Sequence, residues 1–144
     1  MPAWKRLRQL SRADWALLLR AGSVVCLVRL GLCILPFRSL RRVIARLRNG
    51  TIPPATRPTP ARIAWAVAAA SRLVPRATCL TQALATQVLL TRVGYRGVLH
   101  LGVALDDAGK LLAHAWLECQ GAIIIGGEGK RQFTPLPPLE MGPE

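Results

Sequence analysis

Apolar residues recur with helical spacing through the first half of the chain and with alternating spacing through the second. One apolar run covers residues 15–35 and ends at Pro36, and a second helix with apolar residues three and four apart is predicted to start at Phe37. The first run is long enough to span a bilayer, but Arg20 and Arg29 fall on opposite faces and are costly in lipid. We therefore expect a buried or membrane-surface helix, with a true span as the alternative.

A proline-rich segment at residues 49–60 divides the chain. It is predicted to link a basic, apolar helical region at 1–48 to a core at 61–136, which is followed by a tail at 137–144.

Two helices are predicted at the start of this core. Thr59 and Pro60 are typical of the N-cap and first position of an Ala-rich helix, in which Trp65 is expected to be buried. Thr78 is expected to cap a second helix that Gly94 ends.

Strands follow these helices. Residues 98–105, 111–119 and 122–125 have the composition and spacing of strands, and turns are predicted at 106–109 and 120–121. Helices followed by a small antiparallel sheet predict an α+β fold.

The charge is concentrated in the first two thirds of the chain. The sequence holds 20 Lys and Arg against 7 Asp and Glu, and residues 1–100 carry 17 of the basic residues and one of the acidic ones. Such a surface suits nucleic acid, an anionic membrane or an acidic protein. No helix-turn-helix spacing, RNA-binding aromatic pair or Gly-x-x-Gly loop is present, so nucleic acid is not expected as a partner.

The chain contains four cysteines, Cys26, Cys33, Cys79 and Cys119, without a C-x-x-C pair or a Cys/His cluster at zinc-binding spacing. No metal or other cofactor is predicted. We expect a cytoplasmic protein with reduced thiols that can also touch a membrane surface through its N-terminal helices.

Cys79 and the two histidines carry the candidate chemistry. Cys79 falls in the first turn of a predicted helix, where unpaired amides favour a thiolate, so it is either a nucleophile or an inert buried thiol. His100 and His114 fall on predicted strands, where a lone histidine is usually structural.

Several short segments together resemble the transglutaminase-like leader peptidases of lasso peptide biosynthesis, in particular the stand-alone B2 proteins. The resemblance covers roughly residues 60–136 and is carried by Thr78-Cys79-Leu80, Ala83-Leu84-Ala85, Leu101-Gly102-Val103 and Ala113-His114-Ala115-Trp116-Leu117-Glu118. It implies a transglutaminase-like or papain-like fold and a cysteine peptidase that removes the leader from a lasso precursor peptide. Cys79 would match the nucleophile and His114 the general base.

The resemblance also implies partners. A macrolactam-forming cyclase would act on the freed amino terminus, and a separate leader-recognition protein of the B1 type would bind the leader in trans. The basic N-terminal helices would offer docking surfaces for one of these proteins or for an acidic leader segment.

The third catalytic residue departs from the family pattern. The family's Asp position corresponds to Gly126, and hairpin arithmetic from a turn at 120–121 places Gly127 opposite His114. Glu128 is the nearest carboxylate in sequence and is the candidate third member, with a solvated turn residue as the alternative. The enzyme would otherwise work as a Cys-His dyad, use a backbone carbonyl, or be impaired.

Trp116 and Glu118 share the strand face of His114 and are predicted to contact substrate. A core position for Trp116 and a structural role for Glu118 are the alternatives. Because Gly126 removes the family's carboxylate, a non-catalytic peptide-binding or scaffold protein in the same assembly remains the second hypothesis for function.

Overall fold

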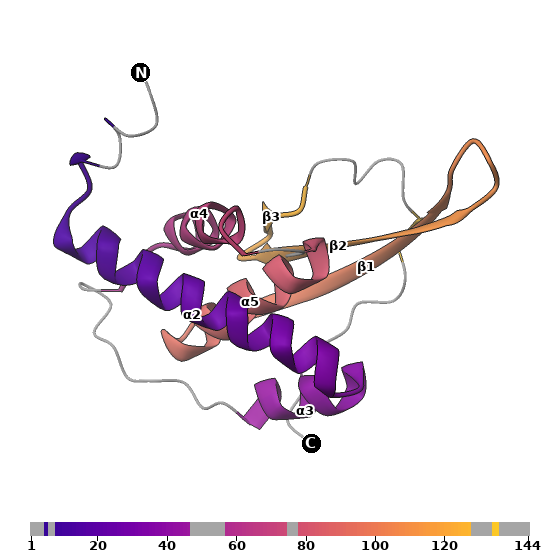
Figure 1. Ribbon diagram of the computed structural model, residues 1–144, viewed down its shortest axis with the longest axis horizontal. Helices are drawn as coiled ribbons and strands as arrows, with labels where there is room; N and C mark the ends of the chain where they lie inside the picture. The colour runs from indigo at the N-terminus through magenta and orange to yellow at the C-terminus, as the bar shows by residue number, and fades with distance from the viewer. Residues whose placement is uncertain (1–4, 6–7, 47–56, 75–77, 128–133, 136–144) are drawn as a thin grey trace.

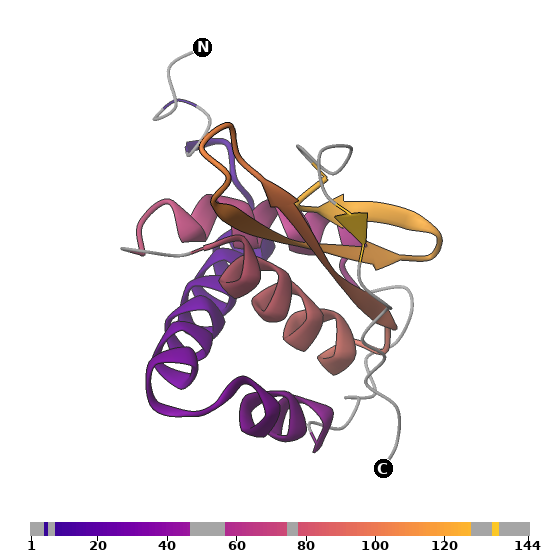
Figure 2. The same cartoon turned by 90° about the vertical axis from the view of Figure 1, so that its right-hand side faces the viewer.

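The computed structural model describes residues 5, 8–46, 57–74, 78–127 and 134–135. In this part of the chain the helices are α2 (Arg12–Ile34), α3 (Phe37–Arg46), α4 (Pro60–Ser71) and α5 (Cys79–Arg92). The strands are β1 (Gly97–Leu105), β2 (Leu111–Cys119), β3 (Ala122–Ile125) and β4 (Thr134–Pro135), in the antiparallel order β3-β2-β1-β4. α5 lies against the sheet, and α2 crosses α4 and α5 on their outer side (Figures 1 and 2). The α+β class is confirmed.

Threonine side chains cap α4 and α5, as the sequence predicts. The Thr59 hydroxyl accepts a hydrogen bond from the Arg62 amide, and the Thr78 hydroxyl accepts one from the Thr81 amide. Each cap satisfies an amide that the first helical turn leaves without a partner. Cys79 is consequently the first residue of α5.

The end of α5 is tied to the start of the sheet. Gly94 stops the helix with φ +92°, and the Tyr95 amide donates to the Leu90 carbonyl. One turn earlier, the buried Gln87 side chain donates from Nε2 to the Gly97 carbonyl at 3.2 Å. The C-terminal half of α5 is thereby held against the first residue of β1.

α5 is the central helix of the core. Residues 83–90 are buried at every position, as is typical of a helix that is packed on all sides. α2 contributes to the same core through Ala21, Val24, Val25 and Val28.

Trp65 is not in the core, contrary to expectation. Its side chain is 36% exposed, and the Arg62 guanidinium lies over the ring at 4.2 Å. The inner face of α4 is occupied by smaller residues, among them Ala64, Ala66 and Val67, which allow close packing against neighbouring helices.

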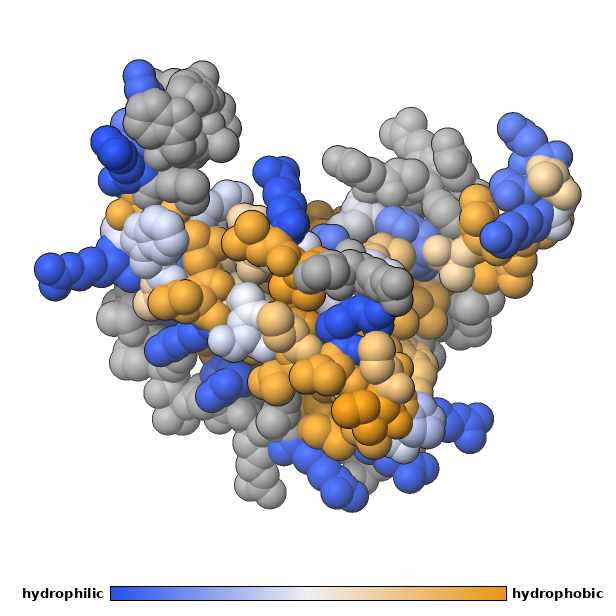
Figure 3. Space-filling view, in the orientation of Figure 1, coloured by the Kyte–Doolittle hydropathy of each residue, from blue (hydrophilic) through white to orange (hydrophobic). Residues whose placement is uncertain are grey.

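The outer face of α2 is apolar and exposed, and Figure 3 shows apolar side chains gathered along this helix. By length and composition α2 could cross a membrane, although a core helix or a signal sequence passes the same test. In the structure 22% of its most apolar window is buried inside the protein.

The predicted turns are present, but β3 contains an irregularity that the sequence does not indicate. Gln120 and Gly121 both have positive φ, 54° and 79°, as in a type I′ turn, and Cys119 pairs with Ala122 as expected. The register then shifts by one residue in β3. The prediction that Gly127 lies opposite His114, which assumed an unbroken register, is therefore wrong.

An ion pair between Asp14 and Arg62 joins α2 to α4. Hydrogen bonds from the Arg62 side chain and the Ser11 amide lower the pKa of Asp14. A lowered folded-state pKa gives stability that is present above the unfolded-state pKa and is lost as the pH falls through the folded value.

We expect Asp14→Asn to lower the urea midpoint at about pH 7, with the difference from the unmodified protein closing towards about pH 2. Asp107→Asn, in an exposed turn, is the control and should change little. A constant difference across this pH range would contradict the assignment.

Candidate active site

Cys79 occupies the position expected of a nucleophile. It is half-buried at the start of α5, and its side chain packs against the edge of the core. The other cysteines differ in place: Cys26 and Cys33 are exposed on α2, and Cys119 is buried in β2, where burial raises its thiol pKa. Among these four thiols, Cys79 alone lies in the first turn of a helix.

His114 is held by a main-chain carbonyl. Its Nε2 lies 2.6 Å from the carbonyl oxygen of Gly126. Because a carbonyl oxygen can only accept, this bond requires the proton on Nε2 and makes Nδ1 the basic nitrogen of the neutral ring. The carbonyl thus orients the imidazole in one tautomer, as a carboxylate does in a catalytic triad.

Gly126 cannot be replaced by a residue with a side chain without a backbone change. Its φ is +78°, and a Cβ built there would lie 2.5 Å from the Ala115 carbonyl oxygen and 2.9 Å from Trp116 Cα. Both neighbours are backbone atoms, which have little room to move. The position that holds Asp in the family resembled by this chain therefore contributes a carbonyl here.

The Trp116 ring contacts both histidines. It stacks on His100 with centroids 5.6 Å apart and on His114 with centroids 6.0 Å apart. At 1% exposure, it fixes the orientation of both histidines by packing. Its predicted contact with substrate stays a prediction.

The lengths of α5 and β1 place the start of α5 at about the level of His114 along the strands. From Gln87, bonded to Gly97, α5 extends back about 12 Å to Cys79. β1 extends about 17 Å from Gly97 to Gly102, the pairing partner of His114. α5 and β1 run side by side in opposite directions (Figure 2). By these lengths, Cys79 and His114 both fall towards the same end of the sheet.

No contact between described residues joins the Cys79 thiol to the His114 imidazole. Ala115 and Leu117 belong to the core beneath α5, and strand alternation directs His114 and Trp116 to the other side of β2. Among the described residues, no hydrogen bond connects Cys79 with His114. Their pairing in catalysis therefore stays a prediction.

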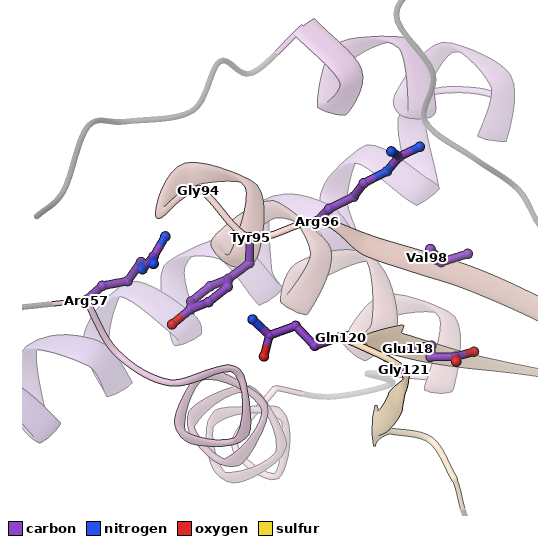
Figure 4. Close-up of a pocket in the computed structure, with 8 residues that line it drawn as sticks. All are labelled: Arg57, Gly94, Tyr95, Arg96, Val98, Glu118, Gln120 and Gly121. Atoms are coloured by element: carbon purple, nitrogen blue, oxygen red, sulfur yellow. The ribbon is translucent and has the colours of Figure 1, made fainter. Parts of the chain in front are cut away.

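A cavity of about 470 Å³ lies at the far end of the sheet (Figure 4). Tyr95 and Gln120 point towards one another across it, and the Arg57 guanidinium lies 4.4 Å from the Tyr95 ring. Glu118 also lines the cavity, with its carboxylate 2.9 Å from His100 Nε2, although the two groups are not aligned as a hydrogen bond. The predicted substrate residue Glu118 is thus at a concave surface.

The structure reveals site features that sequence reasoning missed. Arg57 and Tyr95 are brought to the cavity from segments far apart in the chain, and no local motif marks them. His100 was recognised as a strand residue, but its approach to Glu118 depends on cross-strand register. Glu128, the predicted third catalytic residue, lies outside the described residues.

The family model of the transglutaminase-like superfamily matches residues 22–137. The chain belongs to this superfamily. Its members include cysteine peptidases, and catalysis by a cysteine is frequent among them. Comparison with curated proteins and with solved structures gives no significant match. The match includes α5, the sheet and most of α2.

Alkylation rates test the prediction that Cys79 is a nucleophile. We expect iodoacetamide to modify Cys79 faster than the other three cysteines near neutral pH, as a nucleophile in the first turn of a helix should react. Cys119 should be slowest, since its thiol is buried and its pKa is raised. Peptide mass spectrometry over a time course gives the four rates. Faster labelling of exposed Cys26 or Cys33 would count against an activated Cys79.

Proposed function

We propose that this protein is a cysteine peptidase that cleaves the leader from a lasso peptide precursor. The observation that carries the proposal is the 2.6 Å bond from His114 Nε2 to the Gly126 carbonyl, which supplies an oriented base despite the missing carboxylate. Cys79 at the start of α5 and membership of the superfamily support the same conclusion. The resemblance of the motifs around Cys79 and His114 to lasso peptide leader peptidases supports a lasso precursor as the substrate.

In the proposed reaction, the His114 imidazole takes the proton of the Cys79 thiol, and the resulting thiolate attacks the scissile carbonyl carbon to form a tetrahedral intermediate. The backbone amide of Cys79 is the candidate donor to the resulting oxyanion. The protonated His114 imidazole gives its proton to the leaving amine, so the peptide bond breaks and a thioester remains on Cys79. Water, activated by the same imidazole, then hydrolyses the thioester and releases the leader.

The cavity supports a role in binding a part of the precursor that lies away from the cleaved bond. Glu118 and its pairing partner Val98 line the cavity on the strand face that also carries His114. The four-residue step from His114 to Glu118 corresponds to about 13 Å along the strand. An extended peptide of about four residues would cover this distance. Arg57 and Glu118 would then bind polar groups of the precursor.

Partners follow from the same proposal. A leader-recognition protein would deliver the precursor, and a cyclase would use the amino terminus that cleavage frees. The alternative is a scaffold protein that binds the precursor but does not cut it, favoured by glycine at the family's Asp position.

The test is a reconstituted assay that combines the full chain, its leader-recognition partner and the cognate precursor, read by mass spectrometry. Cleavage at a single bond supports the peptidase. Binding of an uncut precursor would favour the scaffold. In the same assay, Glu128→Gln asks whether a carboxylate helps the Gly126 carbonyl to orient His114. A large loss would assign that role to Glu128.

A further inference from the structure

The outer face of α2 is an apolar stripe that the described protein leaves uncovered. Leu19, Leu27, Leu30 and Ile34 are each more than half exposed, and Trp15 is 45% exposed. At 100° per residue these five side chains occupy about 120° of the helix surface. Isolated exposed leucines are ordinary, whereas several on one face of a helix mark a contact surface, and Figure 3 shows apolar side chains gathered here with some polar ones between them.

The rest of α2 is committed to the protein core. Ala21, Val24, Val25 and Val28 occupy the opposite face and pack against α4 and α5. The ion pair of Asp14 with α4 holds the N-terminal end of the helix. Crossing a bilayer would break these contacts, so the stripe can contact lipid only if α2 lies parallel to the membrane surface.

Arginines border the stripe. Arg20 and Arg29 fall at its two margins on the helix wheel, and Arg12 lies at the start of the helix. α3 adds Arg38, Arg42 and Arg46, all exposed, together with exposed Val43. From residue 12 to residue 46 the chain carries seven arginines and one aspartate, and that aspartate is paired with Arg62.

Two polar side chains in or beside the stripe make hydrogen bonds within the helix. The Ser23 hydroxyl donates to the Leu19 carbonyl at 2.9 Å, and the Arg29 guanidinium donates to Cys33 Sγ at 3.1 Å. The Ser23 hydroxyl can therefore enter hydrocarbon with its proton bonded, whereas the Arg29 guanidinium, at the margin of the stripe, stays at the headgroups.

We propose that α2 and α3 bind the surface of an anionic lipid bilayer, with the stripe in the outer hydrocarbon and the arginines at the headgroups. An apolar face bordered by basic side chains is typical of interfacial helices, and long arginine side chains reach the headgroups from its margins. The excess of arginines over acidic residues in this stretch matches anionic headgroups. The inference is independent of the peptidase activity.

The experiment measures co-flotation of the full chain with phosphatidylcholine vesicles that contain or lack phosphatidylglycerol. We expect binding to the anionic vesicles and at least about tenfold weaker binding to the neutral ones. Leu19→Gln/Leu27→Gln should weaken anionic binding by at least about tenfold. Leu105→Gln/Leu111→Gln removes two leucines of similar exposure from the β1–β2 hairpin and should bind as the unmodified protein does.

Arg20→Gln/Arg42→Gln should reduce the preference for anionic vesicles and the salt dependence of binding. Equal binding to both lipids, or equal losses in the stripe and hairpin variants, would overturn the proposal. Resistance of the bound protein to alkaline carbonate would indicate a span instead. The unmodified protein could sediment as a dimer while the Leu19→Gln/Leu27→Gln variant sediments as a monomer and binds vesicles unchanged. That result would assign the stripe to contact with a second copy of this chain.

Discussion

Cys79→Ala is expected to leave the precursor uncut, with kcat/KM reduced by about a thousandfold or more, because the proposed mechanism then lacks its nucleophile. Cys26→Ala and Cys33→Ala are matched controls on the exposed face of α2 and should retain cleavage. The thermal midpoint of Cys79→Ala should stay near that of the unmodified protein, since the side chain is only half-buried. Retained cleavage by Cys79→Ala would remove the peptidase assignment.

The two histidines extend this test, because both stack on Trp116. His114→Ala should match the loss seen for Cys79→Ala, and the double variant should be no worse than either single one. His100→Ala removes the other imidazole from the same tryptophan and should keep kcat within about tenfold. Equal losses at both histidines would indicate that Trp116 packing is what matters, and not a base at His114.

Restoring the family's carboxylate with Gly126→Asp is expected to damage this protein. A positive φ costs a residue with a side chain about 1–2 kcal/mol, and the contact of its Cβ with the Ala115 carbonyl adds to this. We expect the free energy of unfolding to fall by at least about 2 kcal/mol. Cleavage should also be lost, because the displaced carbonyl would no longer hold His114.

Gly121→Asp is the matched control for this substitution. Gly121 has nearly the same φ, +79°, but nothing lies within 4 Å of a Cβ built there. It should cost only about 1 kcal/mol and retain cleavage. Urea unfolding and the cleavage assay together separate backbone strain from loss of the orienting carbonyl. A stable Gly126→Asp variant with faster cleavage would show that a carboxylate, and not the carbonyl, is the better orienter of His114.

The position of Cys79 was predictable because helix ends are encoded within a few residues. The Thr78 hydroxyl reaches an amide three residues ahead, and Gly94 adopts a positive φ that favours glycine. The α+β class followed from similarly local signals, the change from helical to alternating spacing and the turn at 120–121. None of these signals requires knowledge of what packs against the segment.

Other features depend on residues that are distant in sequence, and only the tertiary structure decided them. The extra residue in β3 arises from pairing with β2, so it could not be read from β3 alone, and the bond between the Gly126 carbonyl and His114 joins residues twelve apart in the chain. Trp65 and the outer stripe of α2 are as apolar as the buried faces of their helices, so composition alone could not tell which side meets the core. The small residues of α4 and the valines of α2 face the core, because their shapes allow the helices to approach closely.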